Sequence, residues 1–571
     1  MNSKHKSPER IKEVVSERVI YPSRSGRKIV GYIDSPGEGA KKRPFVIMAP
    51  KYGETKKNNL FLAYYLAING LSVLRFDHTS HVGESDGVMT EFTLESGVED
   101  ILASLDYLDK QFGANKVALL ASSLSARSSI RAAAMDKRVT HLLCLVGVVN
   151  VQHTLNEVYR EDLVANHISG KTWGVTDILG HEIDFDQFLN VAVAKDMHNL
   201  EGSRKDLASL TIPVSFYPAE KDVWVDIDEV NAVVPKGNNS GVFPISGAMH
   251  EVRESTGAAD KVYLEVVSRI KSVAGITLGL KENLKVPHKR TVLSQNKVER
   301  EALRIANPIK HTENEFWTDY LEKYRMLDQV TDFREYMDLV GELLGPIKEG
   351  DLVLDAGCGN GMFGLSLVRR LIEQKREEWG KPALYVGVDL TAKGLGDAME
   401  MHTDTQLAAR NQPGLFADNS IAIQTFYTQM DLDKFGREGT SDDMVLFEDQ
   451  MFDKICCSLL VSYLKLPLDF MKQLHRVLKP GGIIMISSMK PFCDMSLIYR
   501  DFMDEKVPES ELDSARGLLR AAGAIKIKEE QGYYVFYSGD ELSQMMQKAG
   551  FSQCSVFSSF GNQADIVRAI A

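Results

Sequence analysis

The chain has few of the features that mark secreted, membrane-spanning or nucleic-acid-binding proteins. Six cysteines occur in 571 residues, none in a C-x-x-C spacing, so neither a disulfide framework nor a zinc site is indicated. No run of 18 apolar residues exists, and residues 1–18 are charged and lack the apolar segment of a secretory signal. The net charge of -12 disfavours nucleic-acid binding, because phosphate backbones attract basic surfaces. We expect a cytoplasmic protein without a metal, a nucleic-acid partner or stable membrane insertion.

The first half of the chain alternates apolar runs with helical patterns, and 44% of all residues are hydrophobic. This alternation predicts an α/β domain with a mostly parallel, doubly wound sheet. The alternation stops over about 150–210, where no strand is evident, and a long insertion of this kind is usually a cap or binding loop. The strands are expected at 44–49, 71–76, 116–121, 140–149, 213–217 and 241–245.

A second α/β alternation begins after an aromatic-rich segment, 316–344, and the length suits two or three domains. A polar stretch before it has no strand period and is predicted to be a linker. A further helical insertion is expected over 489–535. The predicted organisation is therefore a domain over 1–280, a linker over 281–310 and a domain over 311–571. The strands of the second domain are expected at 352–355, 384–389, 423–427, 452–458 and 483–487.

A serine at the end of an apolar run is the first candidate catalytic group. The strand 117–120 leads into Ala121-Ser122-Ser123-Leu124-Ser125, and a helical pattern follows. A nucleophile at a sharp strand-to-helix turn needs small residues two before and two after it. Ala121 and Ser125 stand where glycine is usual, and both are small. Ser122 and Ser125 are rival nucleophiles, but their side chains are expected to point away from the position that Ser123 faces.

The order of the remaining groups supports a catalytic serine, because this arrangement uses serine, then an acid, then histidine. Asp222 and His250 each follow a later predicted strand, so both are expected at the sheet edge that holds Ser123. Asp226 is the rival acid. The backbone N–H of Leu124 and an N–H of Lys51 or Tyr52 would form the oxyanion hole. His78 and His81 are expected to hydrogen-bond within their own loop.

Several stretches of the first domain resemble the acyltransferase of bacterial bioluminescence, a myristoyl-carrier-protein thioesterase family with an α/β-hydrolase fold. The resemblance covers about 19–270, and the family shares the alanine and serine at the elbow. It implies a fatty or polyketide acyl thioester as substrate, delivered by an acyl carrier protein or as acyl-CoA. It also implies Ser123 as nucleophile, Asp222 as acid and His250 as base, with 150–210 as the cap over the acyl chain. The stretches are Arg75-Phe76-Asp77-His78, Glu91-Phe92-Thr93, Ala121 to Arg127, Val146 to Asn150 and Asp222-Val223-Trp224-Val225.

The second domain opens with a glycine-rich turn after an acidic strand end, Asp355-Ala356-Gly357-Cys358-Gly359-Asn360-Gly361. Glycines at such a turn let the backbone approach a ligand closely. The next predicted strand ends at Asp389, where a carboxylate can accept hydrogen bonds from both ribose hydroxyls. The segment 359–364 also fits G-x-G-x-x-G of dinucleotide-binding proteins, so a nicotinamide-dependent reductase is an alternative. The carboxylate of Asp355 disfavours it, because it would repel a pyrophosphate but suits an ammonium group.

The motif resembles that of class I methyltransferases, which use S-adenosylmethionine, and the resemblance covers about 316–571. Leu474 to Gly482 is similar to the helix-to-strand turn of that family. The resemblance implies a Rossmann-like fold and a glycine loop, Gly357, Gly359 and Gly361, around the methionine part of the donor. By the same resemblance Asp431 would contact the adenine amino group, and Cys457 and Ser458 would lie on the methyl-transfer face.

The methyl acceptor is not identified by the sequence. Phe316, Trp317, Tyr320 and Tyr324 would form an aromatic lid over the site or, alternatively, a helix packed on the domain core. Methyl transfer can proceed by proximity and alignment alone, so a carboxylate acceptor needs no base. If a base is needed, Tyr463 is the best candidate.

Two functions therefore remain open for the whole chain. The favoured one is a bifunctional enzyme that releases or transfers an acyl group through Ser123 and methylates the acyl substrate or product. The alternative is a methyltransferase whose hydrolase-like half only binds a carrier protein or lipid.

Overall fold

The chain forms two compact α/β units, which are described separately. The first comprises Met1–Pro308 with Lys526–Gly532, and the second comprises Ile309–Ile525 with Tyr533–Ala571. In the described residues no helix is both long enough and apolar enough to cross a bilayer. The computed structural model describes residues 13–37, 43–274, 284–308, 313–373, 381–410, 423–435, 447–506 and 512–571.

An eight-stranded sheet in the order β1-β2-β4-β3-β5-β6-β9-β10 forms the centre of the first unit. The pairs β1–β2 and β2–β4 are antiparallel, and all later neighbours are parallel. This is the α/β-hydrolase arrangement that the sequence predicts. The strands are β1 (Val14–Pro22), β2 (Lys28–Pro36), β3 (Phe45–Ala49), β4 (Ser72–Phe76), β5 (Val117–Ser122), β6 (Val139–Leu145), β9 (Val214–Tyr217) and β10 (Gly241–Val242).

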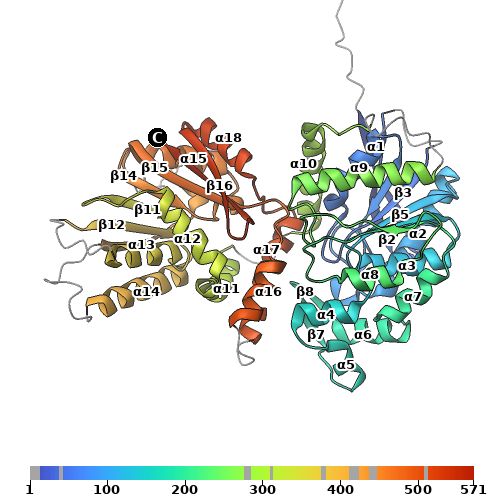
Figure 1. Ribbon diagram of the computed structural model, residues 1–571. Helices are drawn as coiled ribbons and strands as arrows, with labels where there is room; N and C mark the ends of the chain where they lie inside the picture. Colours follow the sequence, from blue (N-terminus) through green and yellow to red (C-terminus); the bar gives the residue numbers. More distant parts are fainter. Residues whose placement is uncertain are drawn as a thin grey trace, which may run out of the picture. The chain divides into compact units, whose positions relative to one another are not determined.

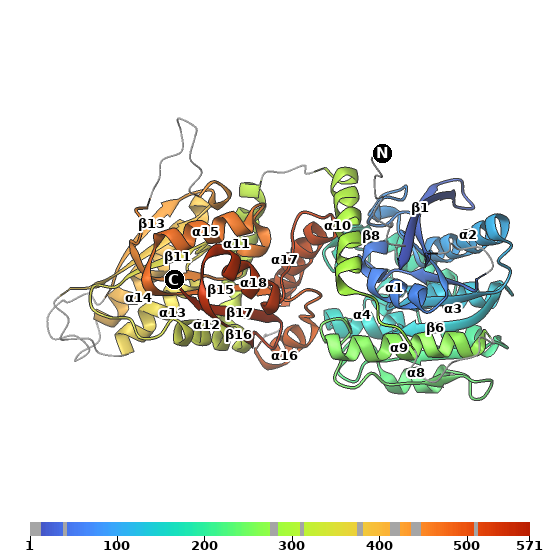
Figure 2. The same ribbon diagram turned by 90° about the horizontal axis from the view of Figure 1, so that it is seen from above.

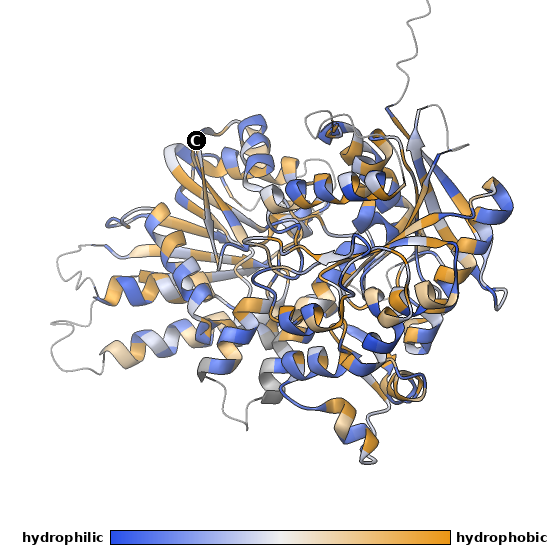
Figure 3. Cartoon of the chain, turned by 45° about the vertical axis from the view of Figure 1, so that its right-hand side comes forward, coloured by the Kyte–Doolittle hydropathy of each residue, from blue (hydrophilic) through white to orange (hydrophobic). Residues whose placement is uncertain are grey.

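Helices cover both faces of this sheet (Figure 1). On one face α1 (Leu60–Ile68) and α9 (Thr256–Val273) pack against Val46 and Met48 of β3. The other face is covered by α2 (Leu94–Phe112) and α3 (Ser125–Met135). All five residues of β3 are buried, as expected for a parallel strand with helices on both sides. The central strands are accordingly rich in hydrophobic residues (Figure 3).

The segment between β6 and β9 contains the insertion. A short antiparallel hairpin lies inside it, although no strand was evident from the sequence. Each hairpin strand has only four residues, which is too short for a clear alternating pattern. The elements are α4 (Val151–Tyr159), α5 (Leu163–Ile168), β7 (Val175–Ile178), β8 (His181–Asp184), α6 (Phe185–Ala194) and α7 (Leu200–Ala208). Helix α8 (Ile227–Val233) follows β9.

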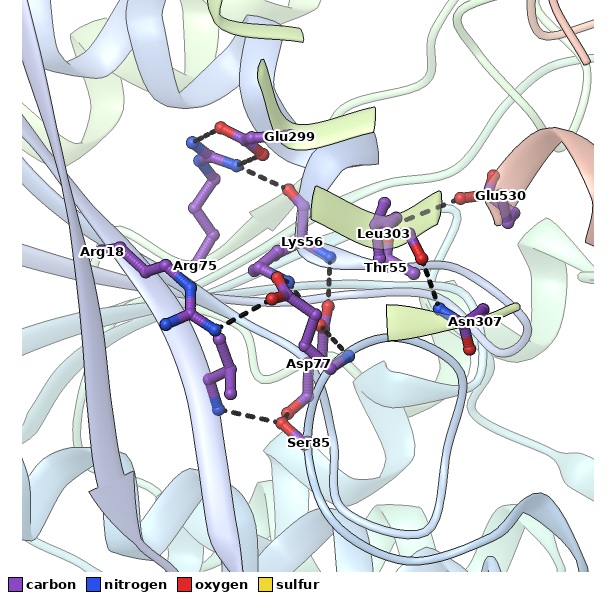
Figure 4. A network of polar contacts seen from close by, with 12 residues as sticks. Arg18, Thr55, Lys56, Arg75, Asp77, Ser85, Glu299, Leu303, Asn307 and Glu530 are labelled. Atoms are coloured by element: carbon purple, nitrogen blue, oxygen red, sulfur yellow. Dashed lines mark hydrogen bonds and ion pairs between the residues drawn. The ribbon is translucent and has the colours of Figure 1, made fainter. Parts of the chain in front are cut away.

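The structure differs from the predicted linker over 281–310. Most of that range is helix α10 (Lys289–Ala306), which belongs to the first unit. Its Glu299 is buried and binds the buried Arg75 of β4 through both oxygens, at 2.7 and 2.8 Å (Figure 4). Arg75 also binds Asp34 of β2. Residues 275–283 and 309–312, where the predicted boundaries fall, lie outside the described residues.

A seven-stranded sheet in the order β13-β12-β11-β14-β15-β17-β16 forms the centre of the second unit. Only β17 is antiparallel to its neighbours, so the order is that of a Rossmann-like methyltransferase domain, as the sequence predicts. The strands are β11 (Leu352–Ala356), β12 (Ala383–Asp389), β13 (Ile423–Gln429), β14 (Phe452–Cys457), β15 (Leu478–Met489), β16 (Ser552–Ser559) and β17 (Ala564–Ile570).

Two helix layers enclose this second sheet (Figure 2). One hydrophobic cluster joins α12 and α13 to one face, and another joins α15 and α18 to the opposite face. Because parallel strands end at the same sheet edge, the ends of β11, β12 and β14 meet there. The helices of this unit are α11 (Glu313–Tyr324), α12 (Thr331–Leu343), α13 (Met362–Glu373), α14 (Ala392–Arg410), α15 (Pro467–Val477), α16 (Ser496–Lys506), α18 (Gly539–Ala549) and the part of α17 (Leu512–Glu530) that precedes Lys526.

Candidate active sites

The backbone turn at Ser123 has the geometry of a nucleophile elbow. Ser123 lies between the end of β5 and the start of α3 and has φ = +54°, a left-handed conformation that is uncommon for residues other than glycine. Its N–H donates to Leu145 O at 3.1 Å, and its carbonyl accepts from Val148 N at 3.0 Å. These two bonds to the segment after β6 hold the turn in its strained form.

Ser123, His250 and Asp222 form one hydrogen-bonded chain of side chains. Ser123 Oγ lies 2.7 Å from His250 Nε2, and His250 Nδ1 lies 2.7 Å from Asp222 Oδ2. A carboxylate only accepts hydrogen bonds, so neutral His250 carries its proton on Nδ1 and accepts from Ser123 at Nε2. Asp222 Oδ1 accepts from the N–H groups of Trp224 and Val225. The sequence had placed these three residues at one sheet edge, and the structure brings them into direct contact.

The rival residues have other roles in the structure. Ser125 Oγ donates to the carbonyl of Pro50, which explains a serine where such turns usually have glycine. Ser122 is buried at the end of β5. Asp226 accepts from Asp228 N at 2.7 Å and caps the N-terminus of α8. In the described part of the chain, none of the three hydrogen-bonds to His250.

One candidate donor of the oxyanion hole, Leu124, is next to Ser123 in the sequence, and the other two, Lys51 and Tyr52, are in the turn after β3. The N–H groups of Leu124, Lys51 and Tyr52 form no hydrogen bond within the described residues, so they are available to a ligand. Leu124 N lies at the N-terminus of α3, where helix N–H groups have no partner in their own helix. Ser125 ties this helix to Pro50, directly before the other two donors.

A buried ionic network links the turn at Lys51 to the loop that carries His250. Lys51 Nζ donates to His250 O at 3.1 Å and to Glu251 Oε2 at 2.9 Å. Glu251 also pairs with Arg253, which in turn binds Glu54. Burial alone would raise the pKa of Glu251, but Arg253 and Lys51 outweigh it and hold the pKa at about 2. Lys51 was predicted only for its backbone, and no sequence pattern indicated this second role.

The histidines after β4 form contacts that differ from the expected loop-internal ones. His78 Nδ1 lies 3.2 Å from Asp100 of α2. His81 Nε2 accepts from Gly53 N at 3.0 Å, beside the candidate oxyanion donors. Burial holds the pKa of His81 well below its usual value, so it stays neutral and can keep this acceptor role. A single sequence does not reveal partners on elements so far apart in the chain.

The glycine loop of the second unit follows β11 and has left-handed backbone at each predicted glycine. The φ angles are +79° at Gly357, +52° at Gly359 and +83° at Gly361. A β-carbon at Gly361 would lie 2.6 Å from the β-carbon of Ala398, so a larger residue does not fit. Asp389 Oδ2, at the end of β12, accepts from Gly359 N at 2.9 Å. The structure therefore brings Asp389 to the glycine loop, as the sequence predicts.

Asp355 is buried at the end of β11 and has one oxygen without a strong partner. Its Oδ2 accepts from Tyr385 at 2.6 Å. Its Oδ1 forms no hydrogen bond by geometry in the described chain and has only the weak thiol donor of Cys456 beside it. Burial, with a smaller contribution from the charge of Asp389, raises the pKa of Asp355 to about 7. A cationic ligand group at Oδ1 would favour the ionised form of this carboxylate.

Residues outside the motif hold the glycine loop at both ends. Tyr385 of β12 binds Asp355 at its start. His402 of α14 places Nε2 2.7 Å from the carbonyl of Gly361 and Nδ1 2.6 Å from the hydroxyl of Tyr427. The carbonyl only accepts, so His402 carries its proton on Nε2 and Tyr427 donates to Nδ1. These supports were not predicted, because tyrosines in apolar strands have the same pattern as core residues.

The remaining predicted contacts of the methyl donor divide into three cases. Asp431 accepts from Asp433 N at 3.1 Å and caps the short helix η5 (Leu432–Lys434). Cys457 is completely buried in a hydrophobic cluster, so its side chain is a core residue and not a contact surface. Ser458 Oγ lies 2.7 Å from the hydroxyl of Tyr336 at the end of β14. Of the pair, only Ser458 therefore has a polar group at this sheet edge.

The aromatic residues of α11 gather with two tyrosines from later segments. Trp317 lies 4.6 Å from Tyr463 and 5.3 Å from Tyr320, and Tyr463 lies 4.9 Å from Tyr534, between ring centroids. Burial raises the pKa of Tyr463 well above its usual value, and neighbouring tyrosines raise it further. These shifts stabilise the protonated phenol and so do not support the expected role of Tyr463 as a base.

The residues of the second site fit S-adenosylmethionine. Oδ1 of Asp355, which has only the weak thiol donor of Cys456 beside it within the described residues, suits the ammonium group of the methionine moiety. The left-handed glycines let the backbone approach that moiety closely. Asp389 Oδ2 accepts from Gly359 N and has a second lone pair for a ribose hydroxyl, whereas Oδ1 already accepts from both the N–H and the hydroxyl of Thr391.

Comparisons with known proteins follow the division into two units. The model of a family described as "Acyl transferase" matches residues 19–304, half of the chain, and a "Methyltransferase domain" model matches residues 328–556. An acyl transferase of Aliivibrio fischeri (strain MJ11) is 27% identical over 276 residues, 47% of this chain and 89% of the relative. One from Photorhabdus luminescens is 30% identical over 243 residues, 42% of this chain and 78% of the relative.

Solved structures similar to the chain include two esterases. Est1E from Butyrivibrio proteoclasticus with bound ferulic acid has a TM-score of 0.38 and 19% identity, and the match covers 45% of this chain and 97% of the esterase. The Pyrococcus furiosus esterase Pf2001 has a TM-score of 0.33 and 15% identity, and the match covers 45% of this chain and 92% of the esterase.

Proposed function

Because the chain belongs to the acyl transferase family over its first half and contains a methyltransferase domain in its second, we propose that it is a bifunctional enzyme for acyl chains. The first unit releases or transfers a fatty or polyketide acyl group from a thioester of an acyl carrier protein or coenzyme A. The second unit methylates the acyl substrate or product with S-adenosylmethionine. The chain Ser123–His250–Asp222 carries the first part of this proposal.

In the acylation step, Ser123 Oγ attacks the thioester carbonyl while His250 Nε2 takes the hydroxyl proton. Asp222 keeps His250 in the correct tautomer and stabilises the imidazolium that forms. The N–H groups of Leu124 and of Lys51 or Tyr52 stabilise the charge on the carbonyl oxygen. The C–S bond then breaks, and the thiolate leaves with the proton from His250. Water attacks the acyl-serine in the same way, with His250 again as base, and releases the carboxylic acid.

In the second unit, Asp355, the glycine loop and Asp389 bind the methyl donor, and Ser458 lies beside the transfer site. The donor, when bound, supplies an electrophilic methyl group on a sulfonium. The protein residues align donor and acceptor and exclude water. The buried Asp355, whose Oδ1 has no strong hydrogen-bond donor within the described residues, carries this part of the proposal.

The replacement Ser123→Ala tests the acyl-release activity. Acyl release from carrier thioesters should fall by at least about 10⁴-fold, the usual effect of losing a triad nucleophile, while S-adenosylmethionine binds unchanged in equilibrium dialysis. A fluorophosphonate probe should label the wild-type protein at Ser123 and not the variant. Absence of labelling in the wild-type protein would favour the alternative in which the first unit only binds a carrier or lipid. Wild-type release by Ser123→Ala would refute the assignment of the nucleophile.

A further inference from the structure

Three tyrosine side chains of the second unit, Tyr320, Tyr324 and Tyr463, form what we call the hydroxyl cluster. Tyr320 and Tyr324 lie one turn apart on α11, with ring centroids 5.6 Å apart. Tyr463 ends the short helix η6 (Val461–Tyr463), five residues after Ser458. All three rings are half-buried, and Trp317 packs against both Tyr320 and Tyr463.

The hydroxyl cluster lies next to the proposed donor site. Leu321, between the two tyrosines of α11, is so close to the glycine loop that a β-carbon at Gly359 would stand 3.1 Å from its side chain. Tyr336 lies near Tyr324 and raises the pKa of that residue. The hydroxyl of Tyr336 lies 2.7 Å from Ser458 Oγ, directly after β14. The cluster therefore adjoins both the loop that binds the donor and the strand end where transfer takes place.

The three hydroxyls differ from the other tyrosine hydroxyls around the site because they form no hydrogen bond within the described residues. By contrast, Tyr385 donates to Asp355, Tyr427 bonds to His402, and Tyr336 bonds to Ser458. Tyr534 donates to Glu313 at 2.7 Å. None of these three hydroxyl oxygens is among the buried polar atoms that lack a partner, so each is accessible to a ligand. Accessible phenol donors beside the donor site suit a ligand that accepts hydrogen bonds.

The cluster acts as a set of donors. Burial raises the pKa of each of its tyrosines, and the tyrosines and Cys493 nearby raise it further. The phenols therefore keep their protons at neutral pH, so they can donate hydrogen bonds but cannot deprotonate an alcohol or a carbon acid.

We propose that the hydroxyl cluster binds the carboxylate of the methyl acceptor, so that the product is a methyl ester. This inference rests on the proposed function, because it assumes that the second unit binds S-adenosylmethionine. A carboxylate has two oxygens with about four acceptor positions, which matches three phenol donors and leaves one lone pair for reaction. That lone pair forms the C–O bond as the methyl–sulfur bond breaks and its electrons stay on sulfur. The carboxylate charge cancels the sulfonium charge, and no base is needed.

The variants Tyr320→Phe, Tyr324→Phe and Tyr463→Phe test the proposal, because each removes one hydroxyl and keeps the ring. The dissociation constant of tetradecanoic acid is measured by calorimetry in the presence of S-adenosylhomocysteine, which cannot transfer a methyl group. Each variant should weaken binding about tenfold, the effect of one hydrogen bond to a charged group. Tyr107→Phe in the first unit is the matched control and should bind as the wild type does. Unchanged binding in all three variants would overturn the proposal.

A panel of acceptors separates this proposal from the proposed function. The wild-type protein should methylate tetradecanoic acid, and the methyl group should be released by mild alkali, as expected for an ester. Methylation of tetradecanol, with an alkali-stable ether as product, would overturn the carboxylate proposal but leave methyl transfer intact. Failure to bind S-adenosylmethionine in equilibrium dialysis would overturn the methyltransferase function itself, while the binding of tetradecanoic acid would still test the cluster.

Discussion

Single side chains explain how each site keeps its geometry when no ligand is bound. In the first unit, Lys51 joins the candidate oxyanion turn to the loop of His250, about 200 residues later in the chain. In the second, Tyr385 and His402 hold the two ends of the glycine loop. These residues touch no reacting atom in the proposed mechanisms. Their effect is to preorganise groups that do, which is how remote residues influence rate and affinity.

The ionisation of Asp355 predicts how donor affinity depends on pH. Its pKa of about 7 in the donor-free protein reflects burial first and the nearby charge of Asp389 second; Tyr385, Cys358 and Cys456 also face it. The ammonium group of the donor binds the ionised carboxylate, so protonation of Asp355 opposes binding. The dissociation constant of S-adenosylmethionine should therefore rise on the order of tenfold per unit as pH falls from about 7 to 5.

Isothermal titration calorimetry at several pH values measures this dependence. The matched variant is Asp355→Asn, which keeps the side-chain shape but cannot ionise. It should bind the donor more weakly at pH 8, and its affinity should no longer change between pH 7 and 5. A wild-type affinity that is constant over that range would contradict the assignment of Asp355 to the ammonium group.

At the scale of elements, the sequence predicts best what depends on neighbouring residues. The elbow at Ser123 and the turn at Gly357 are local motifs whose small residues permit a tight backbone, and the structure has both. Asp222 and His250 each follow a later strand, and this order was enough to predict that both lie at the sheet edge that holds Ser123. The role of Ser125, by contrast, depends on the carbonyl of Pro50 on another element.

Helix α10 shows why other elements escaped prediction. Its composition is polar, and the long-range contact that anchors it pairs Glu299 with Arg75, 224 residues earlier. A charged residue in a sequence is ordinarily exposed, so a buried ion pair cannot be inferred from either partner alone. The hydroxyl cluster escaped for the same reason, because Tyr463 is distant in the sequence from Tyr320 and Tyr324. The hairpin β7–β8 escaped because each of its strands has only four residues.

The buried ion pair between Glu299 and Arg75 leads to a prediction about the stability of the first unit. Burial opposes ionisation of Glu299, but Arg75 outweighs it and keeps the pKa of Glu299 below its usual value. Glu299→Ala would leave Arg75 with only Asp34 as a charged partner, and should lower the free energy of unfolding by about 3 kcal/mol. Glu301→Ala on the same helix removes an exposed pair with Arg304 and should cost less than about 1 kcal/mol.

Thiol labelling during urea unfolding can follow the first unit alone. Cys144 is completely buried in β6, and it is the one cysteine in residues 1–308. Its modification, read by mass spectrometry of the peptide that contains it, reports unfolding of that unit. Equal midpoints for Glu299→Ala and Glu301→Ala would show that the ion pair does not anchor α10.

At the scale of the whole molecule, the two proposed chemistries have a necessary order. A thioester has no free carboxylate, so the acceptor that we propose for the hydroxyl cluster exists only after water has cleaved the acyl-serine at Ser123. The Ser123→Ala variant should therefore form no methyl ester from an acyl-carrier thioester. It should methylate added tetradecanoic acid at the wild-type rate, because its second unit is unaltered.

Complementation between chains then tests whether the acid passes through solution. A mixture of Ser123→Ala chains and Asp355→Asn chains contains one intact acyl-release site and one intact methyl-transfer site, on different molecules. If the released acid diffuses freely, the mixture should form methyl ester from a carrier thioester after a lag that shortens as the chain concentration rises. Ester formation by the wild-type protein without such a lag would instead mean that the acid reaches the second unit of its own chain without passing through solution.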